Sequence, residues 1–299
     1  MAAQPTLGNW LSIAALGLIW GATFMVVAIA LEGYGPLTVA CARTTLGAAA
    51  LLLLMRVLHR PLPSFTPQMR GYLVAIGLFN TAVPFALLSW GQQFVPSAFA
   101  GISMAALPLF VLPLAHVFTD EKLQLRSILG VCLGFIGATV LIGPGVLRIG
   151  TGMEPLGQIA CVLASISYAV SSIMTRRCPP IDPITLAALL LTVGSVALIP
   201  AMLIFEGIPQ VEALRPTLAI LFLGFVPTAL AALIRVTTIR SAGAVFMTLV
   251  NYQVPLWSMF FGVLVLNEVL PLRFFAALGL ILTGLAISQW SNLKRLLLR

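Results

Sequence analysis

Apolar residues form ten long runs along the chain, and the short stretches between them hold most of the charged residues. Each run is about 20 residues long, the length at which an α-helix crosses the hydrocarbon core of a bilayer. The runs cover residues 10–31, 36–56, 71–90, 97–118, 126–143, 155–175, 183–205, 216–236, 241–264 and 273–291. We therefore predict an all-α integral membrane protein with ten transmembrane helices.

The fourth and fifth runs recur as the ninth and tenth. A separation of 147 positions is kept without a gap for three pairs of residues: Pro108 and Pro255, Glu121 and Glu268, and Gly137 and Gly284. This match indicates a duplication that gives five spans each to residues 1–147 and 148–299. Because five is an odd number, the second copy must enter the membrane in the opposite sense. The sequence thus predicts two inverted five-helix repeats.

Composition supports a membrane protein. Hydrophobic residues make up 60% of the chain, charged residues 8%, and the mean hydropathy is +1.09, whereas a soluble domain has about 25% charged residues. The net charge of +8 does not indicate a nucleic-acid partner, because the basic residues lie between apolar runs, where they orient helices in a bilayer.

The distribution of basic residues predicts the topology. Three of them lie in odd-numbered loops, namely Arg148, Arg215 and Arg273. Eleven lie in even-numbered loops or at the C-terminus: Arg56, Arg60, Arg70, Lys122, Arg126, Arg176, Arg177, Arg240, Lys294, Arg295 and Arg299. Since positive loops stay in the cytoplasm, we expect both termini there.

No carboxylate lies within a predicted span, because all eight acidic residues fall in loops or at span ends. Proton-coupled pumps and exporters of organic cations usually keep such a group inside the membrane. We therefore expect facilitated diffusion or exchange of solutes with little net charge. His116 could relay protons, but its place near the end of a span is more typical of a packed or interfacial histidine.

Enzymatic motifs are missing from the sequence. It contains no HExxH, GxSxG or Walker A pattern and only two histidines, His59 and His116. We expect no enzyme, no metal site and no cofactor. A channel remains an alternative to a carrier, since it too would lack coupling residues, although it has less need of proline-broken inverted repeats.

Two asparagines are candidate solute contacts near the middle of their spans. Asn80 lies four residues before Pro84, and Asn251 lies four before Pro255. Each proline lacks the N–H that would bond the asparagine carbonyl. An amide beside a free carbonyl suits the amino group of a small zwitterion. The alternative is a hydrogen bond from each asparagine to a neighbouring helix.

Aromatic and polar side chains complete the predicted solute site. The additional members are Trp20, Phe79, Tyr168, Ser171, Tyr252 and Gln253. Trp20 and Tyr168 lie deep in their spans, where an indole needs a partner for its N–H, and Tyr252 and Gln253 extend the polar run that begins at Asn251. Such a cavity would suit a large apolar side chain, although aromatic residues in membrane bundles also serve as packing.

Arg43 is a basic residue well inside a predicted span. A buried guanidinium demands a partner. It could bind a substrate carboxylate, but we favour a structural role in which it bonds freed carbonyls or a loop acid such as Glu268.

Prolines and glycines indicate the mechanics of the bundle. We expect each copy to contain a helix broken by proline, and we expect four prolines to act as hinges: Pro84, Pro108, Pro227 and Pro255. Gly130, Gly134 and Gly137 give the fifth span a smooth face for close helix packing, and Gly284 repeats it more weakly on the tenth.

The segment Trp20-Gly21-Ala22-Thr23-Phe24, Arg43 and the paired Pro–Glu segments resemble the EamA-type drug/metabolite transporter superfamily. Within it, the chain is most similar to bacterial aromatic amino-acid exporters. The resemblance implies a ten-helix carrier in the bacterial inner membrane that exports neutral amino acids by alternating access. We expect small solutes and lipid as its partners, and a monomer. A phosphorylated-sugar or nucleotide-sugar carrier, or an exporter of other metabolites or drugs, is the alternative. The sugar carriers would want several basic residues in the cavity, where only Arg43 is available.

Overall fold

The computed structural model describes residues 6–118, 125–143, 152–211 and 213–290, and these contain helices and no strands. The helices are α1 (Leu7–Ala30), α2 (Pro36–Val57), α3 (Pro67–Gly77), η1 (Leu78–Ala82), α4 (Val83–Gly91), α5 (Ser97–Ala105), α6 (Leu107–Phe118), α7 (Leu125–Ile142), α8 (Glu154–Arg177), α9 (Pro183–Phe205), α10 (Leu214–Leu223), η3 (Gly224–Leu230), α11 (Ala231–Ala242), α12 (Ala244–Met247), α13 (Val250–Leu266) and α14 (Leu272–Ser288). Several residues of the sequence analysis lie outside the described residues: Glu121, Lys122, Arg148, Lys294, Arg295 and Arg299.

The described helices confirm the all-α membrane architecture. Eight helical segments are long and apolar enough to cross a bilayer, and Val250–Leu266 and Leu272–Ser288 are shorter apolar helices. Together they give the ten expected helices.

Two spans contain a turn of π-helix beside a proline. In η1 the N–H of Val83 donates to the carbonyl of Leu78, five residues earlier, just before Pro84. In η3, which contains Pro227, the N–H of Ala231 donates to the carbonyl of Val226 in the same way. Because proline has no N–H, the usual pattern of hydrogen bonds cannot continue through it, and the helix widens.

The fourth and ninth predicted spans bend at different places. The fourth is interrupted at Ala106, two residues before Pro108, whereas the ninth is interrupted at Thr248–Leu249. Pro255 lies inside the continuous helix α13, so the expected break at this proline is wrong. A proline removes a single helical hydrogen bond, and a helix that is packed on its neighbours can continue past that gap.

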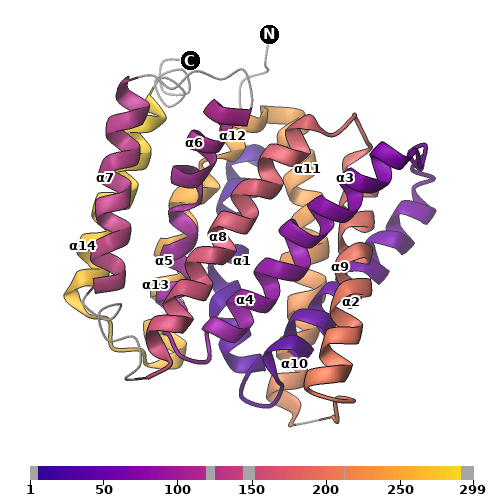
Figure 1. The fold of residues 1–299 in the computed structure, drawn as a ribbon, viewed down its shortest axis with the longest axis horizontal. Helices are drawn as coiled ribbons and strands as arrows, with labels where there is room; N and C mark the ends of the chain where they lie inside the picture. The colour runs from indigo at the N-terminus through magenta and orange to yellow at the C-terminus, as the bar shows by residue number, and fades with distance from the viewer. Residues whose placement is uncertain (1–5, 119–124, 144–151, 212, 291–299) are drawn as a thin grey trace.

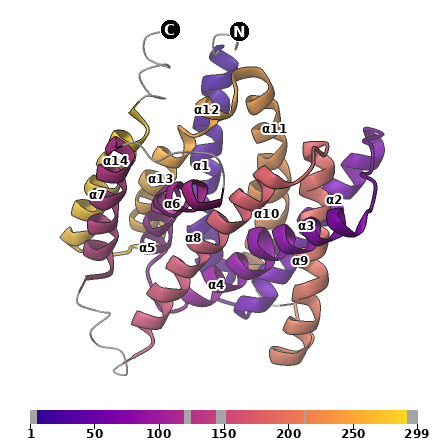
Figure 2. The ribbon, with the colours of Figure 1, turned by 45° about the horizontal axis from the view of Figure 1, so that its top comes forward.

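Close helix pairs build the bundle. Figures 1 and 2 show α7 and α14 side by side at one edge of the molecule, and α2 packs on α9 while α4 packs on α8. A Cβ at Gly284 would lie 2.5 Å from the carbonyl oxygen of Gly130, so the two backbones touch. The small-residue faces expected on the fifth and tenth spans thus pack against each other, a pairing that the sequence had not specified.

The bundle has two ends, which we call the Asp182 end and the Glu206 end. Asp182 precedes the first turn of α9, and Glu206 follows the last. In Figure 1 the Asp182 end is at the top, where α1 begins and α14 ends. An even number of crossings therefore separates the first and last described helical residues.

Candidate functional site

Arg43 is a buried cation without an anion. It lies in α2, is 6% exposed, and its Cζ lies 3.9 Å from the centroid of the Phe85 ring in α4. Such a cation–π contact contributes about 2 kcal/mol when it is desolvated. Among the described residues Arg43 has no ion pair or hydrogen bond, and its buried Nε has no acceptor. The guanidinium therefore has free donors for an anionic group.

Glu268 is not the partner of Arg43. Its carboxylate accepts hydrogen bonds from the backbone N–H groups of Ser97, at 2.6 Å, and Ala98, at 3.1 Å. The expected pairing of Arg43 with this acid is thus wrong. The first turn of α5 offers unpaired N–H donors and the positive end of a helix dipole, which attract the carboxylate instead.

Asn80, Ser171 and Tyr168 lie together where η1 meets α8. The hydroxyl of Ser171 in α8 donates to Oδ1 of Asn80 in η1, at 3.1 Å, and lies 2.9 Å from the carbonyl of Tyr168. Tyr168 also packs against the hydrophobic cluster that contains Phe85, the residue under the guanidinium of Arg43. Asn80 therefore makes the interhelical bond foreseen as its alternative role, and its amide is half-buried.

The remaining predicted residues lie elsewhere. Trp20 donates through Nε1 to the carbonyl of Pro227, at 3.2 Å, so the indole has the partner that its depth requires. Gln253 lies across α1, because a Cβ at Gly17 would meet its Oε1 at 2.7 Å. Trp20 thus contacts η3, whereas Gln253 lies where α1 packs on α13.

Three other predicted contacts lie apart from the Phe85 contact of Arg43. Asn251 and Tyr252 are half-buried in α13, and within the part of the chain that the structure describes the buried Tyr252 hydroxyl has no partner. Phe79 is 38% exposed, and its carbonyl accepts a hydrogen bond from Ser167, at 2.8 Å. The structure does not gather these three side chains around the guanidinium.

Sequence reasoning missed three residues of α4. Phe85 lies under Arg43, and Ser89 and Gln92 follow on the same helix, with 1% and 8% exposure. The side-chain polar atoms of Ser89 and Gln92 have no partner among the described residues. The predicted span ended at residue 90, which left Gln92 in a loop. The spacing i, i+4, i+7 was the available signal, since it places three residues on one helix face.

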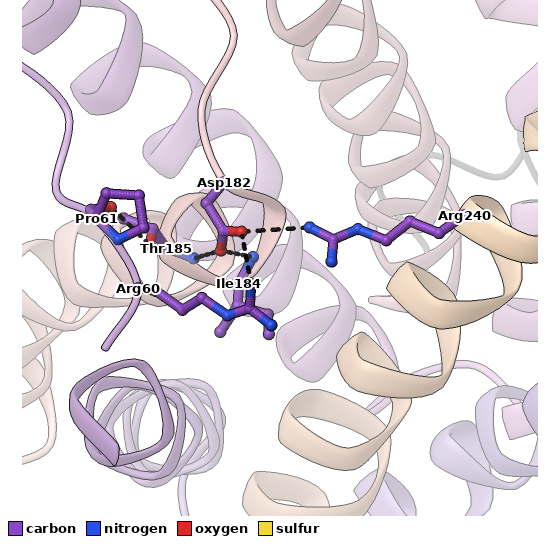
Figure 3. A network of polar contacts seen from close by, with 6 residues as sticks. All are labelled: Arg60, Pro61, Asp182, Ile184, Thr185 and Arg240. Carbon is purple, nitrogen blue, oxygen red and sulfur yellow. Dashed lines mark hydrogen bonds and ion pairs between the residues drawn. The ribbon is translucent and has the colours of Figure 1, made fainter. Parts of the chain in front are cut away.

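A polar network connects three segments at the Asp182 end of the bundle (Figure 3). Asp182 accepts from the N–H groups of Ile184 and Thr185, and its carboxylate lies 3.6 Å from Arg60 and 3.3 Å from Arg240. Thr185 also donates to the carbonyl of Pro61, at 3.1 Å. The network joins the α2–α3 connection, the start of α9 and the end of α11.

Replacing Asp182 by Ala should lower the free energy of unfolding by about 1–2 kcal/mol, because the helix cap and two partly exposed ion pairs are lost together. Asn at the same position keeps the cap, so Asp182→Asn should lose less than about 1 kcal/mol. Thermal unfolding of the purified protein in detergent measures both. Equal loss in the two variants would contradict the division between cap and ion pairs.

An apolar groove of about 620 Å³ runs between α1 and α10. Its lining includes Ala22, Met25, Val26, Ile29, Leu218 and Phe222. Arg215 at its edge pairs with Glu32, at 3.1 Å. None of the predicted solute contacts lines this groove, and its surface suits lipid chains better than a zwitterion.

Comparison with known proteins agrees with this architecture. The model of the EamA-like transporter family matches residues 7–143 and 155–289. YoaV, an uncharacterized transporter of Bacillus subtilis (strain 168), is 24% identical over 95% of this chain and 98% of its own length. YedA, an uncharacterized inner membrane transporter of Escherichia coli (strain K12), is 28% identical over 91% of this chain and 88% of its own.

A protein of known crystal structure shares the fold. Its TM-score is 0.68 at 18% sequence identity, and the match covers 96% of this chain and 99% of that chain.

Proposed function

Since the chain belongs to the EamA-like transporter family, we propose that this multi-pass inner-membrane transporter exports neutral amino acids, aromatic ones above all, by alternating access. The observation that carries the proposal is the buried guanidinium of Arg43, which has no acidic partner among the described residues and lies against Phe85. A fixed cation in the bundle interior fits a solute that brings one carboxylate and little net charge.

The group around Arg43 matches the parts of such a solute. Arg43 takes the carboxylate, because a guanidinium presents paired N–H donors in the geometry of a carboxylate. Phe85 and Tyr168 supply aromatic surface beside it. The Oδ1 of Asn80, which already accepts from Ser171, is an acceptor for the amino group. We assign Trp20, Asn251, Tyr252 and Gln253, on α1 and α13, to the opposing wall of the site.

The proposed mechanism uses two inverted repeats, residues 1–147 and 148–299. The excess of basic residues in even-numbered loops supports a cytoplasmic location for both termini, and with them for the Asp182 end. The Glu206 end then faces outward. The prolines Pro84, Pro108, Pro227 and Pro255 lie in the spans that change shape, and the unequal bends of the fourth and ninth spans support this assignment. The carrier works as a monomer.

Transport is proposed to run without ion coupling. All acidic side chains within the described ranges lie at helix ends or in connections: Glu32, Glu154, Asp182, Glu206 and Glu268. A relay for protons would need a carboxylate nearer the middle of a span.

Purified protein in liposomes tests the function. Liposomes loaded with unlabelled L-phenylalanine should accumulate labelled L-phenylalanine faster than empty liposomes, and the rate should saturate. No pH or sodium gradient should be needed. Uptake that depends strictly on either gradient would refute the uncoupled mechanism, and linear flux without acceleration by internal solute would indicate a channel.

A competition panel tests the solute class. Unlabelled L-tryptophan and L-leucine should inhibit uptake, whereas glucose 6-phosphate should not, because its dianion exceeds the single charge of Arg43. Transport of glucose 6-phosphate in place of the amino acids would refute the proposal and favour a phosphorylated-sugar carrier.

A further inference from the structure

We propose that Ser89 and Gln92 form a polar subsite that receives the solute carboxylate between Arg43 and the Glu206 end of the bundle. The inference rests on the proposed function and adds a route to it. Ser89 and Gln92 do not contact a solute that is bound at Arg43. Their ligand is the carboxylate of the solute as it moves away from Arg43.

The geometry of α4 places the subsite. Phe85 lies under the guanidinium of Arg43, and α4 packs against α2. At about 100° per residue, Ser89 points about 40° from the direction of Phe85, and Gln92 about 20° from it. At 1.5 Å rise per residue they lie about 6 Å and about 10.5 Å further along the helix axis. The three side chains thus form a stripe that leads away from Arg43.

The stripe leads towards the Glu206 end. Glu206 accepts hydrogen bonds from the N–H groups of Leu37 and Thr38, both at 2.8 Å, so this end holds the start of α2. The chain runs through α4 in the opposite direction to α2, because the α2–α3 connection lies at the Asp182 end. Ser89 and Gln92 therefore lie between Arg43 and the Glu206 end.

Ser89 is unusual among the helical hydroxyls of this protein. Thr23, Thr44 and Ser195 each donate to the carbonyl four residues earlier, which satisfies a hydroxyl inside a helix. Ser89 is 1% exposed and its Oγ has no partner among the described residues. Its hydroxyl is thus free to donate to a ligand.

Gln92 shows the same property with a larger side chain. It is the C-cap of α4 and is 8% exposed, whereas the adjacent Gln93 is exposed. Neither Nε2 nor Oε1 of Gln92 has a partner among the described residues. Buried amides are normally hydrogen-bonded. A passing carboxylate would accept from Nε2, and a passing ammonium group would donate to Oε1.

The subsite explains how a solute could leave Arg43. A carboxylate that left the guanidinium for an apolar passage would lose all of its partners at once. Neutral donors replace some of them and hold the anion less tightly than a charged group does. Ser89 and Gln92 therefore ease release without forming a second tight site.

Transport by the full chain in liposomes tests the subsite. The double variant Ser89→Ala with Gln92→Leu should slow L-phenylalanine exchange about tenfold, the effect of one lost hydrogen bond to a charged group. Binding of L-phenylalanine to the detergent-solubilised protein should change less than about twofold, since Arg43 is intact. Ser89→Thr, which keeps the hydroxyl, should slow exchange less than Ser89→Ala.

Gln158→Leu is the matched control. Gln158 is also a buried glutamine, 1% exposed, and its Oε1 has no partner among the described residues, but it lies on α8 and its Nε2 donates to Glu154. It should leave exchange unchanged. Unmodified exchange in the Ser89/Gln92 double variant would overturn the subsite, as would an equal loss in Gln158→Leu. No exchange by the unmodified protein would instead refute the proposed function.

Thiol labelling gives a second readout that does not need transport. In a variant without native cysteines, Ser89→Cys and Gln92→Cys should react with a charged, membrane-impermeant methanethiosulfonate, and saturating L-phenylalanine should protect both. Val83→Cys, on the exposed face of α4, should stay unlabelled in lipid. Absence of labelling at 89 and 92 in an active protein would overturn the subsite alone.

Discussion

Arg43→Gln should reduce L-phenylalanine exchange about a hundredfold, because removing one partner of a buried, hydrogen-bonded charge pair costs several kcal/mol. Arg43→Lys should be intermediate, with a loss of about tenfold, since the ammonium keeps the charge but neither stacks flat on Phe85 nor binds a carboxylate with two parallel bonds. Counterflow in liposomes, with L-phenylalanine binding measured in parallel, separates lost affinity from lost turnover.

Arg235→Gln is the matched control for Arg43. Arg235 is also a basic residue within a span, in α11, but its side chain is exposed. The variant should transport normally. Thermal unfolding distinguishes the two roles first considered for Arg43. A structural arginine would cost more stability than the about 2 kcal/mol of the lost cation–π contact with Phe85, whereas one that binds a solute would cost no more than that. Full exchange by Arg43→Gln would remove Arg43 from the site.

Gly284→Ala should destabilise the protein by about 1–3 kcal/mol, the usual cost of forcing extra atoms into a packed contact. The new Cβ would lie 2.5 Å from the carbonyl oxygen of Gly130 and 2.7 Å from the backbone nitrogen of Gly134. Backbone atoms cannot turn aside as a side chain can, so α7 and α14 must separate. Thermal unfolding in detergent measures the loss.

Gly279→Ala, five residues earlier in α14, is the control for Gly284→Ala. A Cβ at Gly279 would meet nothing within 4 Å. Gly279→Ala should therefore keep or raise stability, by up to about 1 kcal/mol, because alanine favours the helix more than glycine does. Equal behaviour of the two variants would contradict the close approach of α7 and α14.

Much of the fold could be predicted because the bilayer limits what a sequence can do. A run of about 20 apolar residues must form a helix that satisfies its own backbone, so the spans follow from composition. The glycine faces around Gly130 and Gly284 could be predicted as packing surfaces because close approach requires residues without side chains, whereas the contact between the two faces came from the structure. These features depend on short stretches of sequence.

The site was harder to predict because it depends on which helices meet. Arg43 needed a partner, but the sequence could not show that the first turn of α5 would hold Glu268. Gln92 was placed in a loop because hydropathy ends the span before it, whereas packing buries it. Pro255 was expected to break a helix, yet its neighbours hold α13 continuous. Each error concerns a tertiary contact.

The unequal bends of the two copies have a further consequence. Ala106, where the fourth span breaks, corresponds to Gln253 in the ninth at the 147-residue separation, and Thr248, where the ninth breaks, corresponds to Gly101 in the fourth. Under the proposed inverted-repeat mechanism, the two repeats exchange conformations when the carrier changes from facing one compartment to facing the other. The bend of the fourth span would then move from Ala106 to Gly101, and the bend of the ninth span from Thr248 to Gln253. The present conformation of each repeat therefore predicts the conformation of the other repeat in the opposite-facing state.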